Sequence, residues 1–167
     1  MLTLRSIHLY PIKSCAGLSM PTADVAALGL AGDRRWMLVD AAGKFVTQRN
    51  YPAMATLVAT PNLVGLTLSA PGRASCEVAK PADDAPRITV TVWKSTLQLP
   101  VAEDSVNAWC SRTLGHPVRL VYLDDEAARA QTSSYAKAGD VVSLADGFPI
   151  LITNTASLVA LNAAMDM

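Results

Sequence analysis

The feature that most constrains the fold is the spacing of the apolar runs in the first hundred residues. Short apolar runs are cut by proline and glycine at intervals of about ten residues, a spacing typical of β-strands and too short for helices. The pattern is clearest in 88–93, where isoleucine and valine alternate with threonine, and threonine and tryptophan add β propensity. We therefore expect a mainly β (α+β) chain, built as a small β-barrel-like N-terminal domain with one short helix.

Several further strands are expected from the same reasoning. Residues 36–39 and 44–47 flank a short loop that ends in Gly43, which favours a hairpin. A second hairpin is expected from 56–59 and 63–69 around a Pro-Asn turn. The remaining expected strands are a single kinked strand over 2–9, a short one at 76–78 and a longer one over 118–123.

The apolar spacing changes from two to three and four at residue 104. Asp104 is expected to cap a short amphipathic helix that ends at Gly115; its apolar face carries Val106, Trp109, Cys110 and Leu114. A second helix is expected to start at Asn154-Thr155. The predicted division is a barrel domain over 1–123, a linker over 124–138 and an incomplete second domain over 139–167. The run 150–152 is expected to lack its strand partners.

Charge and hydropathy exclude several classes of function. Fourteen Lys and Arg balance fourteen Asp and Glu, so no net charge attracts a nucleic acid or an anionic membrane. The apolar runs are far shorter than the roughly 18 residues that span a bilayer, and no secretory signal is visible. Three cysteines without a CxxC pair favour a reducing compartment, so a cytoplasmic protein is expected.

The sequence around Lys13 is the first candidate binding site. A predicted strand ends at a proline turn and then presents Lys13, Ser14 and Cys15, a cation, a hydroxyl and a thiol that could hold an anion. The alternative is a solvated lysine, a turn-capping serine and a small core cysteine. The residues alone favour this alternative.

Two consecutive arginines begin the next strand. Strand alternation directs Arg34 and Arg35 to opposite faces, so one of them can point inward, where it needs an acidic or phosphate partner. Two surface charges, or an ion pair between Arg35 and Asp33, explain the pattern equally well. Residues 47–49 are interpreted as a solvated rim.

Other catalytic classes find no support. Neither His8 nor His116 is paired locally with a thiol, and no HExxH motif, glycine-rich phosphate loop, zinc cluster or dinucleotide fingerprint is present.

The order of three segments resembles one family across essentially the whole chain. These segments are YPIKSCAG, then GLAGDRRWMLVD with GKFVTQR, and ADGFPILITNTASLVALN about a hundred residues later. The arrangement is similar to that of the MOSC (molybdenum cofactor sulfurase C-terminal) proteins. It resembles their N-terminal β-barrel domain joined to the start of a MOSC domain, as in bacterial two-part members and amidoxime-reducing components.

The resemblance implies binding of a molybdenum-molybdopterin cofactor. The family's lysine, serine and arginine contacts fall on Lys13, Ser14 and Arg34, which favours Arg34 over Arg35 as the inward residue. The family's cleft-lining turn falls on Asp146, Gly147 and Phe148, although an ordinary turn is an equal alternative.

The family's metal-binding cysteine lies beyond the last residue of this chain, and Cys15, Cys76 and Cys110 do not match its position. We therefore expect a truncated protein that is inactive alone. Its complete form would reduce N-hydroxylated compounds, with electrons from a ferredoxin-like domain or protein, or would transfer sulfur. The alternative is a non-catalytic β-barrel module that binds a small ligand or a protein.

Overall fold

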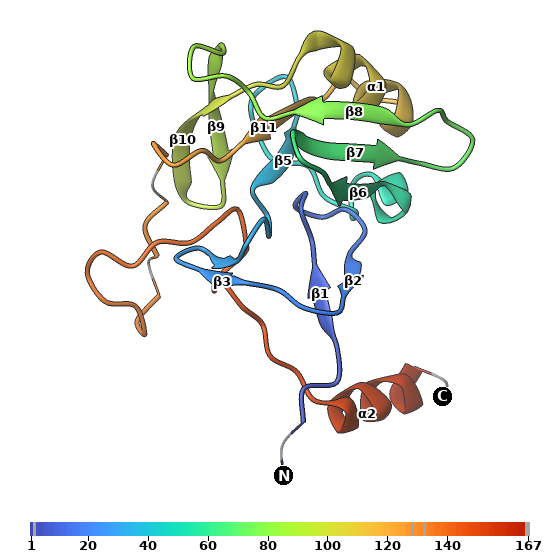
Figure 1. Cartoon of the computed structure of the whole chain (residues 1–167), viewed down its shortest axis with the longest axis vertical. Coiled ribbons are helices and arrows are strands. Elements are labelled where there is room, and N and C mark those ends of the chain that lie inside the picture. Colours follow the sequence, from blue (N-terminus) through green and yellow to red (C-terminus); the bar gives the residue numbers. More distant parts are fainter. Residues whose placement is uncertain (2, 128, 132, 166–167) are drawn as a thin grey trace.

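The computed structural model describes residues 1, 3–127, 129–131 and 133–165. The fold is mainly β, as predicted, with two α-helices; in Figure 1 the strands β5 to β11 and α1 lie in the upper part, β1 to β3 below them and α2 at the bottom. The elements in chain order are β1 (Ile7–Leu9), β2 (Leu18–Met20), β3 (Val25–Ala26), β4 (Gly29–Leu30), β5 (Trp36–Val39), the 3-10 helix η1 (Pro52–Thr56), β6 (Val58–Pro61), β7 (Gly65–Ser69), β8 (Cys76–Ala79), β9 (Arg87–Val92), β10 (Ser95–Pro100), α1 (Asp104–Leu114), β11 (Arg119–Tyr122) and α2 (Thr155–Met165).

Strand pairing closes a ring around one core. β5 pairs antiparallel with β11, and β9 with β10. Single bridges complete the circle: Val101 pairs with Val121, Lys44 with Thr91, and Phe45 with Val39. The predicted hairpin around Gly43 is thus present, although its second arm contributes only bridges.

β5 is buried on both faces because it lies between two cores. Trp36 and Leu38 pack into one cluster with α1, η1 and the three-stranded sheet β6-β7-β8. Met37 and Val39 face the interior of the ring, with residues of β9, β10 and β11. A continuous apolar run without polar alternation is what such a doubly covered strand requires.

The segment 142–145 packs against the ring. Leu144 is fully buried in the same cluster as Met37 and Val39, and its backbone nitrogen donates to the Arg34 carbonyl at 3.0 Å. Arg129 lies in the predicted linker but is buried, and it donates to the Ser143 carbonyl at 2.9 Å. These contacts place the next two residues, Ala145 and Asp146, against the ring. The division into a barrel domain, a linker and a second domain stays a prediction.

Helix α1 confirms the predicted helix with one correction. Asp104 is the first helical residue and Glu103 the N-cap, which makes no side-chain capping bond. Gly115 ends the helix in the left-handed conformation (φ 66°), as predicted, since glycine adopts positive φ without a Cβ clash.

The sequence analysis missed the hairpin partner β10. The β9–β10 turn consists of Trp93 and Lys94, and Trp93 takes the positive φ (53°) that glycine usually takes at the first position of such turns. Without a glycine or asparagine there, the turn had no recognisable signal. The strands β2, β3 and β4 were also missed. The kinked strand predicted over 2–9 is wrong for 3–6, which lie outside β1, and residue 2 lies outside the described residues.

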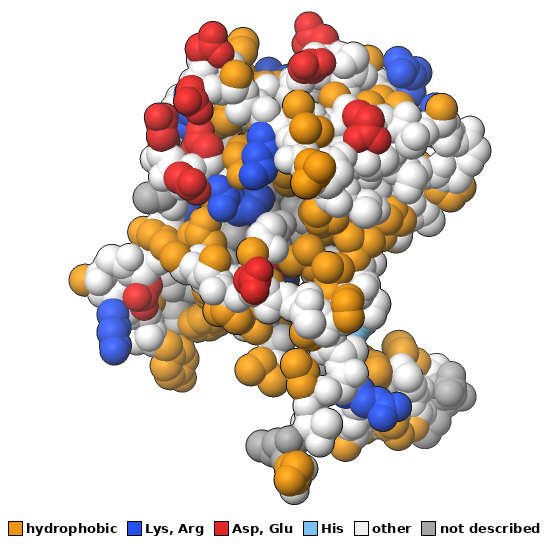
Figure 2. Space-filling model, in the orientation of Figure 1, with side chains coloured by type: hydrophobic (Ala, Val, Ile, Leu, Met, Phe, Trp, Pro, Cys, Tyr) orange, Lys and Arg blue, Asp and Glu red, His pale blue; other side chains and the backbone are white. Residues whose placement is uncertain are grey.

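The C-terminal segment makes little contact with the rest of the chain. Residues 150–152 form no strand, and α2 begins where predicted, with Asn154 Oδ1 accepting from the Ser157 backbone nitrogen at 2.7 Å. The described residues of α2 bury no side chain, and Figure 1 shows the helix apart from the sheets. Apolar side chains are visible around it in Figure 2. Within the described residues, every helix is too short or too polar to cross a bilayer.

Candidate functional site

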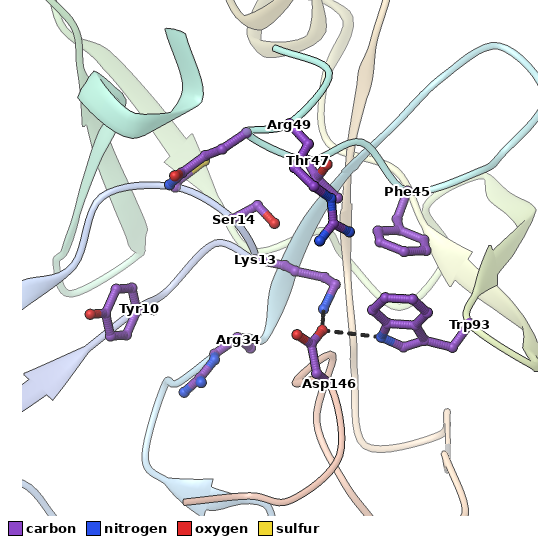
Figure 3. A pocket seen from close by; sticks show the side chains of 11 residues that line it. Tyr10, Lys13, Ser14, Arg34, Phe45, Thr47, Arg49, Trp93 and Asp146 are labelled. Carbon is purple, nitrogen blue, oxygen red and sulfur yellow. Dashed lines mark hydrogen bonds and ion pairs between the residues drawn. The ribbon is translucent and has the colours of Figure 1, made fainter. Parts of the chain in front are cut away.

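A pocket of about 370 Å³ opens beside the ring of strands (Figure 3). Its walls come from five separate stretches of the chain: the turn after β1, the turn before β5, the segment that follows Gly43, the β9–β10 turn and the segment after Leu144. The lining residues are Tyr10, Lys13, Ser14, Cys15, Arg34, Phe45, Thr47, Gln48, Arg49, Trp93 and Asp146. Four of the six predicted cofactor-binding residues, Lys13, Ser14, Arg34 and Asp146, therefore meet in one pocket.

Lys13 lies on the floor of the pocket and is only 4% exposed. Its backbone is fixed because its nitrogen donates to the Trp36 carbonyl at 2.8 Å, next to a parallel bridge between Ile12 and Trp36. Its Nζ donates to Asp146 Oδ1, and it lies 5.4 Å from the centre of the Phe45 ring. A lysine so buried and so fixed is not the solvated surface charge of the alternative interpretation.

The electrostatics of the pocket favour anions. Burial lowers the pKa of Lys13, and the positive charges of Arg129 and Arg34 lower it further, against the opposing effect of Asp146. Burial alone would raise the pKa of Asp146, but the hydrogen bond and charge of Lys13, the Trp93 indole and the charge of Arg34 together lower it. The lining holds the cationic side chains of Lys13, Arg34 and Arg49 against the one carboxylate of Asp146, so the formal charge of the pocket is positive.

Arg34 lines the pocket while Arg35 lies elsewhere. The prediction that the two arginines begin a strand is wrong, because β5 starts at Trp36 and Arg34 lies in the preceding turn with positive φ; this turn, not strand alternation, separates the two side chains. Arg34 pairs with Asp33, which is 1% exposed and also accepts from the Tyr10 nitrogen at 2.8 Å. Its guanidinium carbon lies 5.3 Å from the centre of the Tyr10 ring. Arg35 instead donates to the Leu123 carbonyl at 2.7 Å. The suggested pairing of Arg35 with Asp33 is therefore wrong.

Backbone strain is concentrated in the same pocket. Among the described residues, the non-glycine residues with positive φ are Ser14 (63°), Arg34 (45°) and Trp93 (53°), and all three line it. Such conformations are costly for side-chain-bearing residues and tend to persist at functional sites. Their convergence marks the pocket independently of its charge.

Arg49 is a pocket residue that the sequence analysis missed, because 47–49 were interpreted as a solvated rim. Figure 3 shows its guanidinium directed toward Lys13. The ion pairs found among the described residues do not include Arg49. The aromatic residues Phe45 and Trp93 were also missed as pocket residues. The sequence indicated only their preference for strands, and the tertiary fold brings them to the pocket.

The other two predicted residues lie outside this pocket. Gly147 follows Asp146 but does not line it, and its carbonyl accepts a hydrogen bond from the Gln131 side chain. Phe148 is half-exposed and lines a second cavity of about 480 Å³ with Tyr135 and Pro149. A role for either residue in cofactor binding stays a prediction.

The cysteines of the chain are poor thiolate donors. Cys15 borders the pocket but is 1% exposed, and burial raises the pKa of its thiol far above the ordinary value. Burial also raises the pKa of Cys110, to about 12. Within the described residues, no cluster of three or more His, Cys, Asp and Glu side chains is placed to hold a metal ion.

The fold and the pocket define a small β-barrel protein with a cationic, aromatic-walled binding cleft. The chain belongs to the MOSC N-terminal beta barrel domain family, whose pattern matches residues 1–117. The resemblance seen in the sequence motifs is thereby confirmed, as is the mainly β fold.

Two kinds of curated relatives are similar over most of the chain. The mitochondrial amidoxime-reducing component 1 of Mus musculus is 30% identical over 98% of this chain and 51% of its own length. The molybdenum cofactor sulfurase of Oryza sativa subsp. japonica is 28% identical over 77% of this chain and 16% of its own. The chain thus spans about half the length of the amidoxime-reducing components it matches. Because some relatives are named mitochondrial, the cytoplasmic location stays a prediction.

A solved structure supports the fold alone. The solution structure of a protein from Bordetella bronchiseptica matches with a TM-score of 0.53 and 22% identity, over 70% of this chain and 99% of the other.

Proposed function

We propose that this chain is the part of a MOSC protein that grips the phosphate and pterin of a molybdenum-molybdopterin cofactor. The observation that carries the proposal is the convergence of Lys13, Arg34 and Arg49 on one pocket that holds a single carboxylate. Relatives named for molybdenum cofactor sulfuration support the same cofactor class.

The chemistry of the pocket fits the organic end of that cofactor. Lys13 and Arg49 are the groups that would hold a phosphate, with the Ser14 hydroxyl as a further donor. The faces of Trp93, Phe45 and Tyr10 suit a flat heterocycle. A volume of about 370 Å³ lies within the range of small-molecule pockets.

The pocket residues do not offer a metal ligand. Molybdenum favours a soft thiolate, whereas the buried Cys15 stays a neutral thiol. The bound cofactor would supply two-electron redox chemistry, and this chain's residues would bind it, orient it and shield its phosphate from water.

The proposed activity of the whole protein is reduction of N-hydroxylated compounds, with electrons from a ferredoxin-like domain or protein. The similarity to amidoxime-reducing components over nearly the whole chain favours this activity. Sulfur transfer is the second candidate, favoured by the similarity to the sulfurases. In either case we propose that this chain alone is inactive.

The test is cofactor binding by purified variants. Lys13→Ala and Arg49→Ala are each expected to weaken molybdopterin binding at least tenfold, measured by pterin fluorescence, because each removes a charge-assisted phosphate contact. Arg34→Ala is expected to weaken it less, since Asp33 already engages that guanidinium. Arg5→Ala, which removes an exposed positive charge outside the pocket, is the matched control. Equal affinity in all four proteins would overturn the proposal.

A further inference from the structure

The two members of the Lys13–Asp146 pair differ greatly in exposure. The Lys13 side chain is 5% exposed and the Asp146 side chain 73%. The ammonium is thus the buried member of the pair and the carboxylate reaches it from the solvent side; Figure 3 shows Asp146 between Lys13 and Trp93. Asp146 also accepts a hydrogen bond of 3.1 Å from Trp93 Nε1.

Asp146 therefore holds the position that the pocket's cations would offer to a ligand's anionic group. Arg49, by contrast, is directed toward Lys13 without forming an ion pair with any described carboxylate. An incoming phosphate would meet Lys13 and Arg49 together, and it would repel a carboxylate held at the same ammonium.

The backbone on one side of Asp146 is fixed, while its side chain has room. Buried Arg129 donates to the carbonyls of Ser143 at 2.9 Å and of Asp146 at 3.3 Å. The Asp146 side chain itself is 73% exposed. The carboxylate can therefore leave Lys13 by rotation of its own side chain, with the anchored backbone unchanged.

We propose that Asp146 is a displaceable counter-ion, which neutralises Lys13 while the pocket is empty and is replaced there by the anionic group of the ligand. This inference rests on the proposed function and adds a competition built into the same site. Asp146 raises the threshold for binding, so that weakly charged ligands are rejected and ligands with a doubly charged phosphate are admitted.

The experiment measures inorganic phosphate and phosphate-monoester binding to the whole chain by calorimetry at about pH 8, where both phosphates are mostly doubly charged. Trp93 fluorescence is the second readout, because displacement of Asp146 removes the acceptor of the indole N–H. Asp146→Asn is expected to bind phosphate about tenfold more tightly than the unmodified protein. Asp125→Asn removes the same charge from an exposed ion pair with Arg35 outside the pocket, and it is expected to leave binding unchanged.

Each outcome separates the two proposals. Loss of binding in Lys13→Met with tighter binding in Asp146→Asn supports both. Loss in Lys13→Met with unchanged or weaker binding in Asp146→Asn preserves the anion site and overturns the counter-ion. If Asp146→Asn and Asp125→Asn gained the same phosphate affinity, the gain would come from the change in net charge, and the counter-ion proposal would also be overturned. If no variant binds an anion, both proposals fail. Absence of a ligand-induced change at Trp93, judged against Trp93→Phe, contradicts displacement.

Discussion

Replacing Lys13 with methionine is expected to stabilise the folded protein while it abolishes anion binding. The ammonium is buried, and burial is the chief reason that the pKa of Lys13 is lowered. Its partner Asp146 is largely exposed, so the ion pair is worth only about 0.2–1 kcal/mol, as for surface pairs. Burying an ammonium costs several kcal/mol, and methionine fills the same space without that cost. We expect the free energy of unfolding to rise by about 1 kcal/mol.

The assay is urea denaturation of Lys13→Met, Asp146→Asn and the double variant. Asp146→Asn is expected to lose at most about 1 kcal/mol, because the pair that it breaks is worth no more than that when one partner is largely exposed. The double variant is expected to match Lys13→Met within about 0.5 kcal/mol, since the Asp146 side chain alone lies in water. The thermal midpoint of Lys13→Met should rise by roughly 2–4 °C.

This reasoning would be refuted if Lys13→Met lowered the free energy of unfolding by more than about 1 kcal/mol while the slope of that free energy against urea concentration stayed unchanged. It would mean that the ion pair outweighs desolvation and that Lys13 contributes to folding rather than only to binding. The expected gain instead fits a general observation, that binding groups are often retained at a cost in stability.

Three further outcomes are expected. Gly43→Ala should destabilise the protein by about 2–4 kcal/mol in urea denaturation, because Gly43 has φ +78° and a Cβ there would collide with the Thr89 carbonyl; a change below about 0.5 kcal/mol would contradict the close approach. Deleting 154–167 should shift the thermal midpoint by less than about 2 °C, since the described residues of α2 bury no side chain; a larger drop would reveal packing that the structure lacks. Because the folded pKa of Asp146 lies below the usual 3.8, its contribution is present above that pH and is lost as pH falls through the folded value. When the pH falls from about 5 to 3, the free energy of unfolding of Asp146→Asn, measured in urea, should therefore decrease less than that of the unmodified protein. Equal decreases in the two proteins would contradict a stabilising Asp146 carboxylate.

Local patterns were enough to predict most of the elements. Alternation identified β9 and β11, the three-and-four spacing identified α1, and Gly115 and Asn154 marked helix ends. These features are legible because each depends on residues within one turn or one strand. β10 was missed although Leu97 and Leu99 alternate with polar residues, because the turn before it has Trp93 where a glycine or asparagine would mark a hairpin.

The candidate site shows the limit of the local view. The motif around Lys13 and the pair of arginines at 34 and 35 were evident in the sequence. No pattern could show that Arg49 and Trp93 face the same pocket as Lys13. Those outcomes depend on contacts between residues far apart in the chain.

The sequence by itself determined a β-rich chain of this family, its helices and the cationic motif, because local geometry and side-chain chemistry are properties of neighbouring residues. Only the tertiary structure decided that Leu144, buried in the ring, positions the Asp146 carboxylate over Lys13 from 133 residues away. The physical reason is that burial and electrostatic potential are set by everything packed around a group, and packing exists only once the chain has closed on itself.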